Sequence, residues 1–220
     1  MVQYAMVIDL NRCVGCHTCA VSCKNAWQVP SQEGRAWLKR LGPEQTPYGL
    51  SYTFYPGLCN HCNHPACVPA CPVGKVEKDF TDPATGNTVT TRVAATWKDP
   101  VNGAVAIDRS RCIGCGACVK ACPYQARYLR QPDSGRGTAD KCSFCVDLPE
   151  EGQQPVCVHN CLAGARIFGD LHDPESAVSA ALKKGAIRQG AGPKDLEPNV
   201  YYIGKPKDIF LLTKKGNPRS

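Results

Sequence analysis

Sixteen of the 220 residues are cysteines, and their spacing is the strongest chemical signal in the chain. They form four groups of four: Cys13, Cys16, Cys19, Cys23; Cys59, Cys62, Cys67, Cys71; Cys112, Cys115, Cys118, Cys122; and Cys142, Cys145, Cys157, Cys161. The third group lies in RCIGCGACVKACP (111–123), which has the spacing C-x2-C-x2-C-x3-C-P. In bacterial ferredoxins, three cysteines of this pattern bind one cubane iron–sulfur cluster and the fourth binds another. The pattern therefore predicts 4Fe-4S clusters that are built from paired groups.

Disulfides and zinc sites are two other uses of so many thiols, and both fit the spacing less well. Disulfide frameworks spread cysteines along a chain to join distant segments, whereas these groups bring several thiols around one point. Zinc sites combine two separated C-x2-C knuckles, an arrangement that leaves no place for the third closely spaced cysteine of groups one and three. Groups two and four, with gaps of four and eleven residues before their third cysteine, would fit either metal site by themselves. Clusters are favoured over a zinc-binding interaction module.

Composition and charge exclude other classes of protein. The formal charge of +7 could indicate nucleic-acid binding, but with all thiols ionised on four cubane cores the charge would be about −1. Lys and Arg are also scattered, without the interleaved aromatic residues of a single-strand platform. No apolar run approaches the length of a membrane span, and the first cysteine leaves no room for an export signal before it. We therefore expect no nucleic-acid partner and no membrane span or signal peptide.

The cysteine groups belong to an internal repeat. At an offset of 99 residues, AMVIDLNRCVGCHTCAVSCK (5–24) aligns with AVAIDRSRCIGCGACVKACP (104–123). Groups two and four match through HPACVPAC (64–71) and QPVCVHNC (154–161). A duplicated half with its break near residue 100 is the simplest explanation.

Short elements must position these motifs. Strands are predicted at 4–10 and 103–109, each followed by a turn in which Gly15, Gly114 or Gly116 lets the backbone curl tightly. Residues 24–58 and 72–103 are expected to be β-rich insertions with strand-like pieces at 50–55 and 88–97. A helix is predicted at 173–185, with Asp173 as N-cap, Pro174 at the first position and Gly185 as its end. A strand is expected at 198–204, followed by an irregular basic tail at 205–220.

Other candidate residues receive structural roles. Five histidines lie near the cysteines, and because each site already has four thiols, we expect them to form hydrogen bonds or to pack: His17, His61, His64, His159 and His172. The three tryptophans are assigned to packing or interfaces: Trp27, Trp37 and Trp97. An acidic stretch around group four either lowers a nearby reduction potential or solvates a loop: Asp140, Asp147, Glu150 and Glu151.

The full set of motifs resembles a known family. With the third gap of group four extended over DLPEEGQQPV and followed by ARIFGDLHDPES, the chain is similar from about residue 4 to 204 to the four-cluster iron–sulfur subunit of the dimethyl sulfoxide reductase family of molybdenum and tungsten enzymes. Relatives of this type serve polysulfide, tetrathionate, thiosulfate and arsenate reductases. The resemblance implies an α+β fold of two intertwined ferredoxin-like 4Fe-4S domains with β-rich insertions.

The resemblance also implies which cysteines share a cluster, because in this family the groups pair in nested fashion. The four implied sets are Cys13, Cys16, Cys19, Cys161; Cys142, Cys145, Cys157, Cys23; Cys59, Cys62, Cys67, Cys122; and Cys112, Cys115, Cys118, Cys71. The first domain would comprise 1–48 with 139–204, and the second 49–138 with the insertion 72–103. The repeat itself equally permits group one with two and group three with four. Lys24 and Leu162 replace the proline after the fourth cysteine, which does not ligate.

A family member of this kind is expected to be a non-catalytic electron-transfer subunit. Four 4Fe-4S clusters would relay electrons between a molybdopterin-containing catalytic subunit and a quinone-linked membrane anchor or another redox partner, with no small-molecule substrate bound directly. The same cysteine groups occur in polyferredoxin subunits of hydrogenase and formate dehydrogenase complexes. The expected location is the periplasmic face of the membrane, reached by co-export with the catalytic subunit, with the cytoplasmic face as the alternative. We also expect the apoprotein to be largely unfolded.

Overall fold

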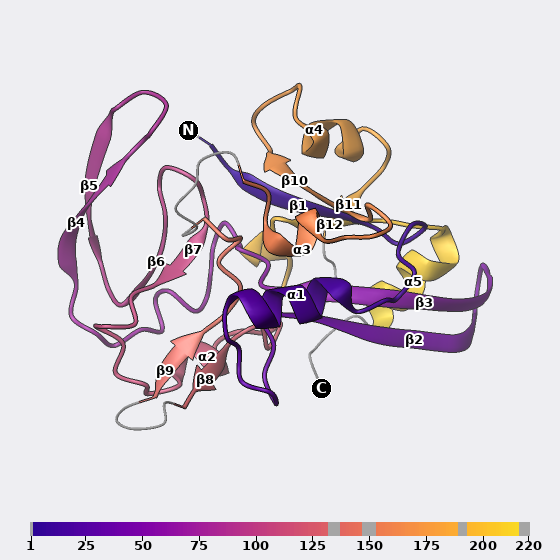
Figure 1. Cartoon of the computed structure of the whole chain (residues 1–220), viewed down its shortest axis with the longest axis horizontal. Coiled ribbons are helices and arrows are strands. Elements are labelled where there is room, and N and C mark those ends of the chain that lie inside the picture. Colours follow the sequence, from indigo (N-terminus) through magenta and orange to yellow (C-terminus); the bar gives the residue numbers. More distant parts are fainter. Residues whose placement is uncertain (1, 132–136, 147–152, 189–192, 216–220) are drawn as a thin grey trace.

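The predicted first strand lies at the centre of the largest sheet in the computed structural model, which describes residues 2–131, 137–146, 153–188 and 193–215. Strand β1 (Tyr4–Asp9) pairs antiparallel with β10 (Arg166–Asp170) and parallel with β12 (Val200–Ile203), which pairs antiparallel with β11 (Ile187–Arg188). The sheet order is therefore β10-β1-β12-β11 (Figure 1). The predicted strands at 4–10 and 198–204 are confirmed.

Alternate residues of β1 contribute to two different cores. Met6 and Ile8 are fully buried in the core that also contains cysteines of groups one, two and four. Ala5 and Val7, on the opposite face, are fully buried in a second core with Val178 and Ala181 of helix α4 (Ala177–Leu182). The period-two alternation of a strand thus separates an aliphatic layer from the thiol-rich interior.

Helix α4 begins later than predicted. Its N-cap is Ser176, whose Oγ accepts a hydrogen bond from the backbone N–H of Ser179 at 3.1 Å. Asp173 instead accepts the N–H of Glu175 at 2.9 Å and forms a turn in front of the helix. The cap therefore lies three residues later than predicted. Gly185, with φ +82°, follows the helix end as predicted.

The first predicted insertion contains a long hairpin. Strands β2 (Ala36–Thr46) and β3 (Gly49–Leu58) pair antiparallel, with a register shift between Leu41 and Glu44. Helix α1 (Thr18–Ala26) includes residues 24–26, which were predicted to begin the insertion. The helix packs against β2.

The predicted irregular tail is a helix. Residues Pro206–Lys215 form α5, which packs on β2 and β3 and buries Leu211 and Leu212 completely. Ser51 Oγ donates to Asp208 Oδ1 at 2.7 Å, and Lys214 forms an ion pair with Glu44 at 3.0 Å. The prediction was wrong because the basic residues of this segment mark only the exposed face of an amphipathic helix. Residues 216–220 lie outside the described part.

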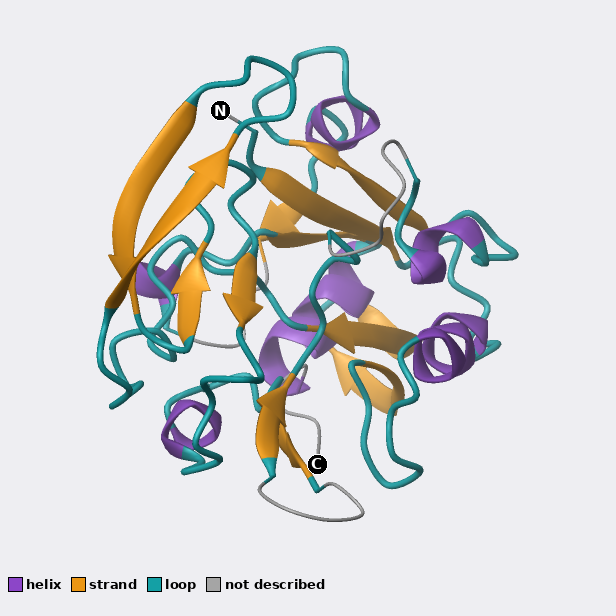
Figure 2. Cartoon of the chain, turned by 60° about the vertical axis from the view of Figure 1, so that its left-hand side comes forward, coloured by secondary structure: helices purple, strands orange, loops and turns teal. Residues whose placement is uncertain are grey.

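The second predicted insertion, 72–103, also contains a hairpin. Strands β4 (Val76–Thr81) and β5 (Thr88–Val93) form a hairpin on one side of the molecule (Figure 2). The expected strand-like run 88–97 is divided into two strands. Its first part, β5, pairs with β4, whereas β6 (Thr96–Lys98) pairs with β7 (Val105–Ile107). At the break, Arg111 Nη1 donates to the carbonyls of Val93 and Ala94 at 3.2 and 3.0 Å.

The remaining elements are short. They are β8 (Tyr128–Arg130), which pairs with β9 (Thr138–Asp140), the helices α2 (Ala117–Lys120) and α3 (Val156–His159), and a 3-10 turn, η1 (Lys194–Leu196). Helices α1 and α2 occupy equivalent places in the repeat, and each follows a residue in the left-handed region, His17 (φ 61°) or Gly116 (φ 74°). In the part of the chain that the structure describes, no helix is long and apolar enough to cross a membrane.

Candidate iron–sulfur centres

Three cavities are each lined by four cysteines from two different groups. We name the thiol sets by their residues: set A is Cys13, Cys16, Cys19, Cys161; set B is Cys23, Cys142, Cys145, Cys157; and set D is Cys71, Cys112, Cys115, Cys118. The cavities have nearly equal empty volumes of about 350, 310 and 330 Å³, with the space open to solvent included. Equal size and equal donor sets indicate sites for the same kind of ligand.

The four cysteines that remain also lie together. Set C is Cys59, Cys62, Cys67 and Cys122, and the pKa of Cys62 is raised by burial and then by the charges of the other three. In each of the four sets, three cysteines of one group meet the fourth cysteine of another. Cys23, for example, lines the cavity of Cys142, Cys145 and Cys157 and not that of its own group. The arrangement of group one with two and group three with four is not seen.

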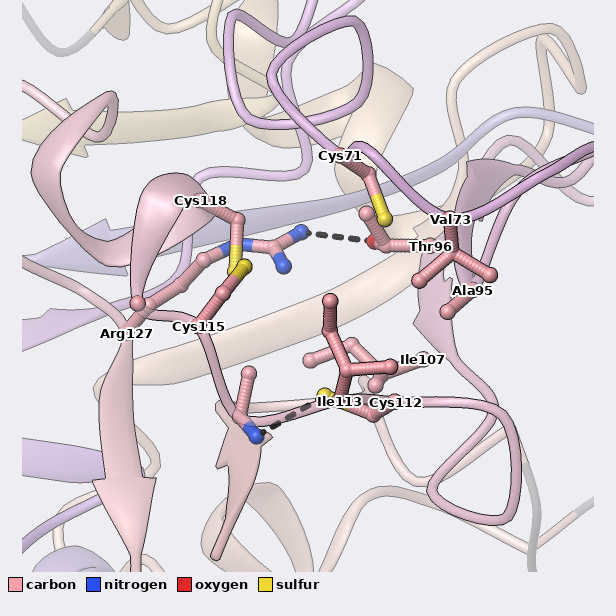
Figure 3. Close-up of a pocket in the computed structure, with 12 residues that line it drawn as sticks. Cys71, Val73, Ala95, Thr96, Ile107, Cys112, Ile113, Cys115, Cys118 and Arg127 are labelled. Carbon is pink, nitrogen blue, oxygen red and sulfur yellow. Dashed lines mark hydrogen bonds between the residues drawn. The ribbon is translucent and has the colours of Figure 1, made fainter.

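Tight turns bring the thiols of sets A and D together. Figure 3 shows the sulfur atoms of Cys71 and Cys118 facing a common space between α2 and the segment that leads to β6. Gly15 and Gly114, at the same position of the two motifs, have φ of 70° and 68°, which a side chain rarely adopts. The turn residues predicted from the sequence are confirmed at these positions.

The sets differ in access to solvent. Cys16 of set A and Cys115 of set D are exposed, and Val14 and Ile113 beside them are exposed apolar residues. By contrast, sets B and C contain no exposed cysteine. Sets A and D therefore each place one thiol at the surface, while the thiols of B and C are buried or half-buried.

Burial makes these thiols difficult to ionise. Desolvation, followed by repulsion from Cys157 and Cys145, raises the pKa of Cys23 to about 12. Desolvation also raises the pKa of Cys67 to about 11 and that of Cys142 well above its usual value. A thiolate in these positions requires a compensating positive charge, and the iron–sulfur core held by the four thiolates supplies it. Metal binding must therefore release protons.

Backbone amides point at several of the sulfur atoms. The N–H groups of Ala139, Phe144 and Ala165 donate to Cys112, Cys142 and Cys161 over 3.3, 3.3 and 3.2 Å. Such donors stabilise negative charge on ligating sulfur. Among the described residues, no group of three or more His, Cys, Asp or Glu side chains is arranged to hold a single metal ion. The residues present fit a four-iron cubane, with four thiols around each space and amide donors beside them.

Two buried arginines are functional candidates that the sequence reasoning missed. Arg127 is 3% exposed and lines the cavity of set D, and Arg166 is 4% exposed and lines that of set A. A signal was present, because each follows the fourth cysteine of its group in the pattern C-x3-A-R, as CPYQAR (122–127) and CLAGAR (161–166). Lys141 is also buried, and its Nζ donates to the carbonyls of Val105 and Cys142.

Asp140 is the one member of the acidic stretch that lies among the described residues. Asp140 is 2% exposed, so it does not solvate a loop. Arg35 and Arg109 donate to its Oδ1 at 2.8 and 2.9 Å, and Tyr128 donates to Oδ2. Burial opposes ionisation, but these partners hold the pKa of Asp140 below its usual value. Asp140 is thus a paired charge that joins β9 to the segment before β2. The other three acidic residues, Asp147, Glu150 and Glu151, lie outside the described residues.

His61 has the packing role that was expected. It is fully buried, its Nδ1 accepts the N–H of Val105 at 2.9 Å, and its ring stacks on Phe144 at 3.7 Å between centroids. Desolvation and the charge of Lys141 place the pKa of His61 well below its usual value, so the ring is neutral. Two tryptophans also pack, Trp37 over Gly57 and Trp97 edge-on against Phe80.

The fold and the thiol sets define a ferredoxin-type 4Fe-4S protein, and comparisons with known proteins agree. A family model described as a 4Fe-4S dicluster domain matches residues 50–171, and one described as a 4Fe-4S binding domain matches residues 10–26. Both descriptions concern iron–sulfur clusters and not zinc.

Known relatives identify the family. The chain is 38% identical to the tetrathionate reductase B subunit of Salmonella typhimurium over 97% of this chain and 77% of that protein. It is 35% identical to the sulfite dehydrogenase B subunit of Allochromatium vinosum over 99% and 92% of the two chains. It is 39% identical to the thiosulfate reductase electron transfer subunit PhsB of Salmonella typhi over 79% of each. The chain belongs to the family of iron–sulfur B subunits of the dimethyl sulfoxide reductase type.

Proposed function

We propose that this protein is a non-catalytic electron-transfer subunit that holds four 4Fe-4S clusters, one on each of the thiol sets A to D. A bound cubane accepts and donates one electron at a time. The observation that carries the proposal is the convergence of all sixteen cysteines into four sets of four within one small protein. The domains would be intertwined, 1–48 with 139–204 holding sets A and B, and 49–138 holding sets C and D. The pairing of β1 with β10 and β12 supports this division.

The proposed order of the sets along the relay is A, B, C, D. Cys19 of set A and Cys157 of set B interact electrostatically, as do Cys142 of set B and Cys59 of set C. Arg127 interacts with Cys67 of set C and Cys118 of set D. The exposed thiols, Cys16 and Cys115, belong to the first and last sets of this order. Electrons would enter at one end and leave at the other.

The chain's own residues would bind these clusters, shield them from water and adjust their reduction potentials. The cysteine thiolates bind iron, backbone N–H groups stabilise charge on the sulfur atoms, and the apolar residues around sets B and C exclude water. Because reduction adds one negative charge in a medium of low dielectric constant, each of these contacts shifts a potential. The potentials, and not any moving part, would direct the flow.

We further infer that the partners are a molybdopterin-containing catalytic subunit and a quinone-linked membrane anchor or another redox carrier. The names of the relatives, each belonging to a reductase or dehydrogenase, support this assignment. A peripheral position on the periplasmic face of the membrane follows if the chain is exported with its catalytic partner. Mass spectrometry of the intact complex tests these assignments, and a hydrogenase or formate dehydrogenase large subunit would contradict them.

Replacement of one exposed ligand tests the relay. In Cys115→Ala, set D loses one thiol, so physiological electron transfer should fall at least tenfold and the iron content should fall. The catalytic subunit should keep its activity with an artificial electron donor, because its own site is unchanged. Lys120→Ala, an exposed change in the adjacent helix α2, is the matched control and should alter neither rate.

Undiminished physiological transfer in Cys115→Ala would refute the relay. The cluster assignment has an independent test in the absorption spectrum and in iron and acid-labile sulfide analysis of anaerobically purified protein. A colourless product that contains zinc would exclude clusters altogether.

A further inference from the structure

Arg127 and Arg166 are equivalent residues in the repeated architecture. Each is the fifth residue after the fourth cysteine of its group. Arg127 immediately precedes β8, and Arg166 is the first residue of β10. In both segments the N–H of the preceding alanine interacts with that fourth cysteine, Ala126 with Cys122 and Ala165 with Cys161. The same local turn therefore directs both guanidinium groups inward.

Each arginine lies between two thiol sets. Arg166 lines the cavity of set A, and its Nη1 is 3.8 Å from Cys157 Sγ of set B. Arg127 lines the cavity of set D, where Figure 3 shows its guanidinium beside Cys118, and it also interacts electrostatically with Cys67 and Cys59 of set C. One cation thus stands between A and B, and the other between C and D.

Neither arginine has a carboxylate partner within the described part of the chain. Arg127 Nη2 donates to the hydroxyl of Thr96 at 3.0 Å, whereas its Nε and Nη1, and Nη2 of Arg166, are buried without a hydrogen-bond partner among the described residues. Arg35, equally buried, differs because it is paired with Asp140 at 2.8 Å. Arginine stays charged in proteins, and a buried unpaired charge is strongly unfavourable. The partner these groups need is an anion that occupies the thiol sets.

We propose that Arg166 raises the reduction potentials of both clusters held by sets A and B, and that Arg127 raises the potentials of both clusters held by sets C and D. This inference rests on the proposed function. Four thiolates around a cubane core of charge +2 carry a net negative charge, which one-electron reduction increases by one unit. A guanidinium between two such sites stabilises the added charge at both of them. The electron comes from the neighbouring cluster or from the redox partner, and no atom is transferred.

The shared position also has a consequence for the relay. Because each arginine acts on both members of a pair, its removal should lower both potentials of that pair and leave the difference between those two potentials nearly unchanged. Removal of one arginine should therefore change the step from B to C, while the steps within each pair keep their size. The two arginines do not ligate iron and would act on the clusters only through their positive charge.

Redox titration of the anaerobically purified holoprotein, followed by electron paramagnetic resonance, tests this proposal. In Arg166→Gln, two of the four midpoint potentials should fall by at least the equivalent of a tenfold change in the reduced-to-oxidised ratio, which is about 59 mV for one electron. In Arg127→Gln, the other two should fall. Arg→Lys at either position keeps the charge and should restore most of the shift. Arg40→Gln, which removes an exposed arginine of β2, is the matched control and should shift none.

Other outcomes overturn the proposal. It fails if the four midpoints shift equally, if no pair shifts, or if lysine restores nothing. If a glutamine variant loses its clusters, the lysine variant carries the test, and a tenfold-equivalent fall despite the retained charge would be contrary to an electrostatic role. These failures differ from failure of the proposed function, in which the unaltered protein itself would lack the four cluster signals.

Discussion

Gly15 shows how closely the cysteine turns are packed. Its φ of +70° lies in the left-handed region, and a Cβ built on it would lie 2.4 Å from the ring of Phe54 on β3. The glycine between the first two cysteines of group one therefore serves two purposes. It allows the turn that directs Cys13 and Cys16 toward one cavity, and it lets the hairpin of β2 and β3 cover that turn.

Gly15→Ala should destabilise the protein more than Gly86→Ala. Gly86 has nearly the same φ, +72°, but open space where its Cβ would be. Alanine at Gly86 should therefore cost only the backbone strain of about 1–2 kcal/mol, whereas at Gly15 displacement of the Phe54 ring adds about 1–3 kcal/mol. Loss of cluster absorbance on anaerobic heating measures the order. Equal midpoints for the two variants would show that Phe54 moves aside freely.

At the scale of elements, helix α5 is a structural part of the molecule. It covers the hairpin of β2 and β3, and Lys207 Nζ donates to the carbonyl of Leu50 at 2.8 Å. Its two leucines belong to the same core as Cys59 and Cys62 of set C. The helix therefore supports the environment of the cysteines from a distance, although it contains no cysteine itself.

Leu212→Ala should lower the free energy of unfolding by about 2–5 kcal/mol, the usual range for truncation of a fully buried leucine. Thr213→Ala, at the next and exposed position, should change it by no more than about 0.5 kcal/mol. Anaerobic denaturant titration of the holoprotein compares the two variants. Similar stability of Leu212→Ala and the unaltered protein would mean that α5 is dispensable for the fold.

These elements illustrate what the sequence could predict. The strand before group one was predictable because β1 has a fully apolar centre, and the turns were predictable because the positions of Gly15 and Gly114 are dictated by the motif. The cap of α4 and the helix at 206–215 were not, because competing caps and a short amphipathic segment are decided by tertiary packing. Similarly, the repeat left two ways to pair the cysteine groups, since pairing depends on contacts between distant segments. The buried arginines share the repeated pattern C-x3-A-R, but that pattern does not by itself indicate that the guanidinium groups lie beside the thiol sets.

At the scale of the whole molecule, the thiol sets occupy the places where a hydrophobic core would otherwise be. Cysteines of all four sets are members of the two main cores, together with a limited number of aliphatic and aromatic side chains. Without metal, these cavities bring together thiols and unpaired guanidinium groups. Binding of the clusters should therefore supply a large part of the folding free energy.

The apoprotein should accordingly be largely unfolded. Complete removal of iron and sulfide with a chelator under reducing conditions should abolish near-ultraviolet circular dichroism and any cooperative thermal transition. Reconstitution with iron and sulfide should restore both, which controls for irreversible damage. A cooperative transition that persists in iron-free protein would show that the polypeptide folds by its own packing.

The central position of β1 has a consequence for biosynthesis. Its neighbours β10 and β12 begin at residues 166 and 200, and the fourth thiol of set A is Cys161. At typical synthesis rates the ribosome needs roughly 10–30 s to travel from β1 to β10. During that interval the nascent chain displays Cys13, Cys16 and Cys19 with neither a strand partner nor a complete set of thiols. Cofactor delivery to set A must therefore wait until Cys161 has been synthesised, and the three early thiols need protection from oxygen in the meantime.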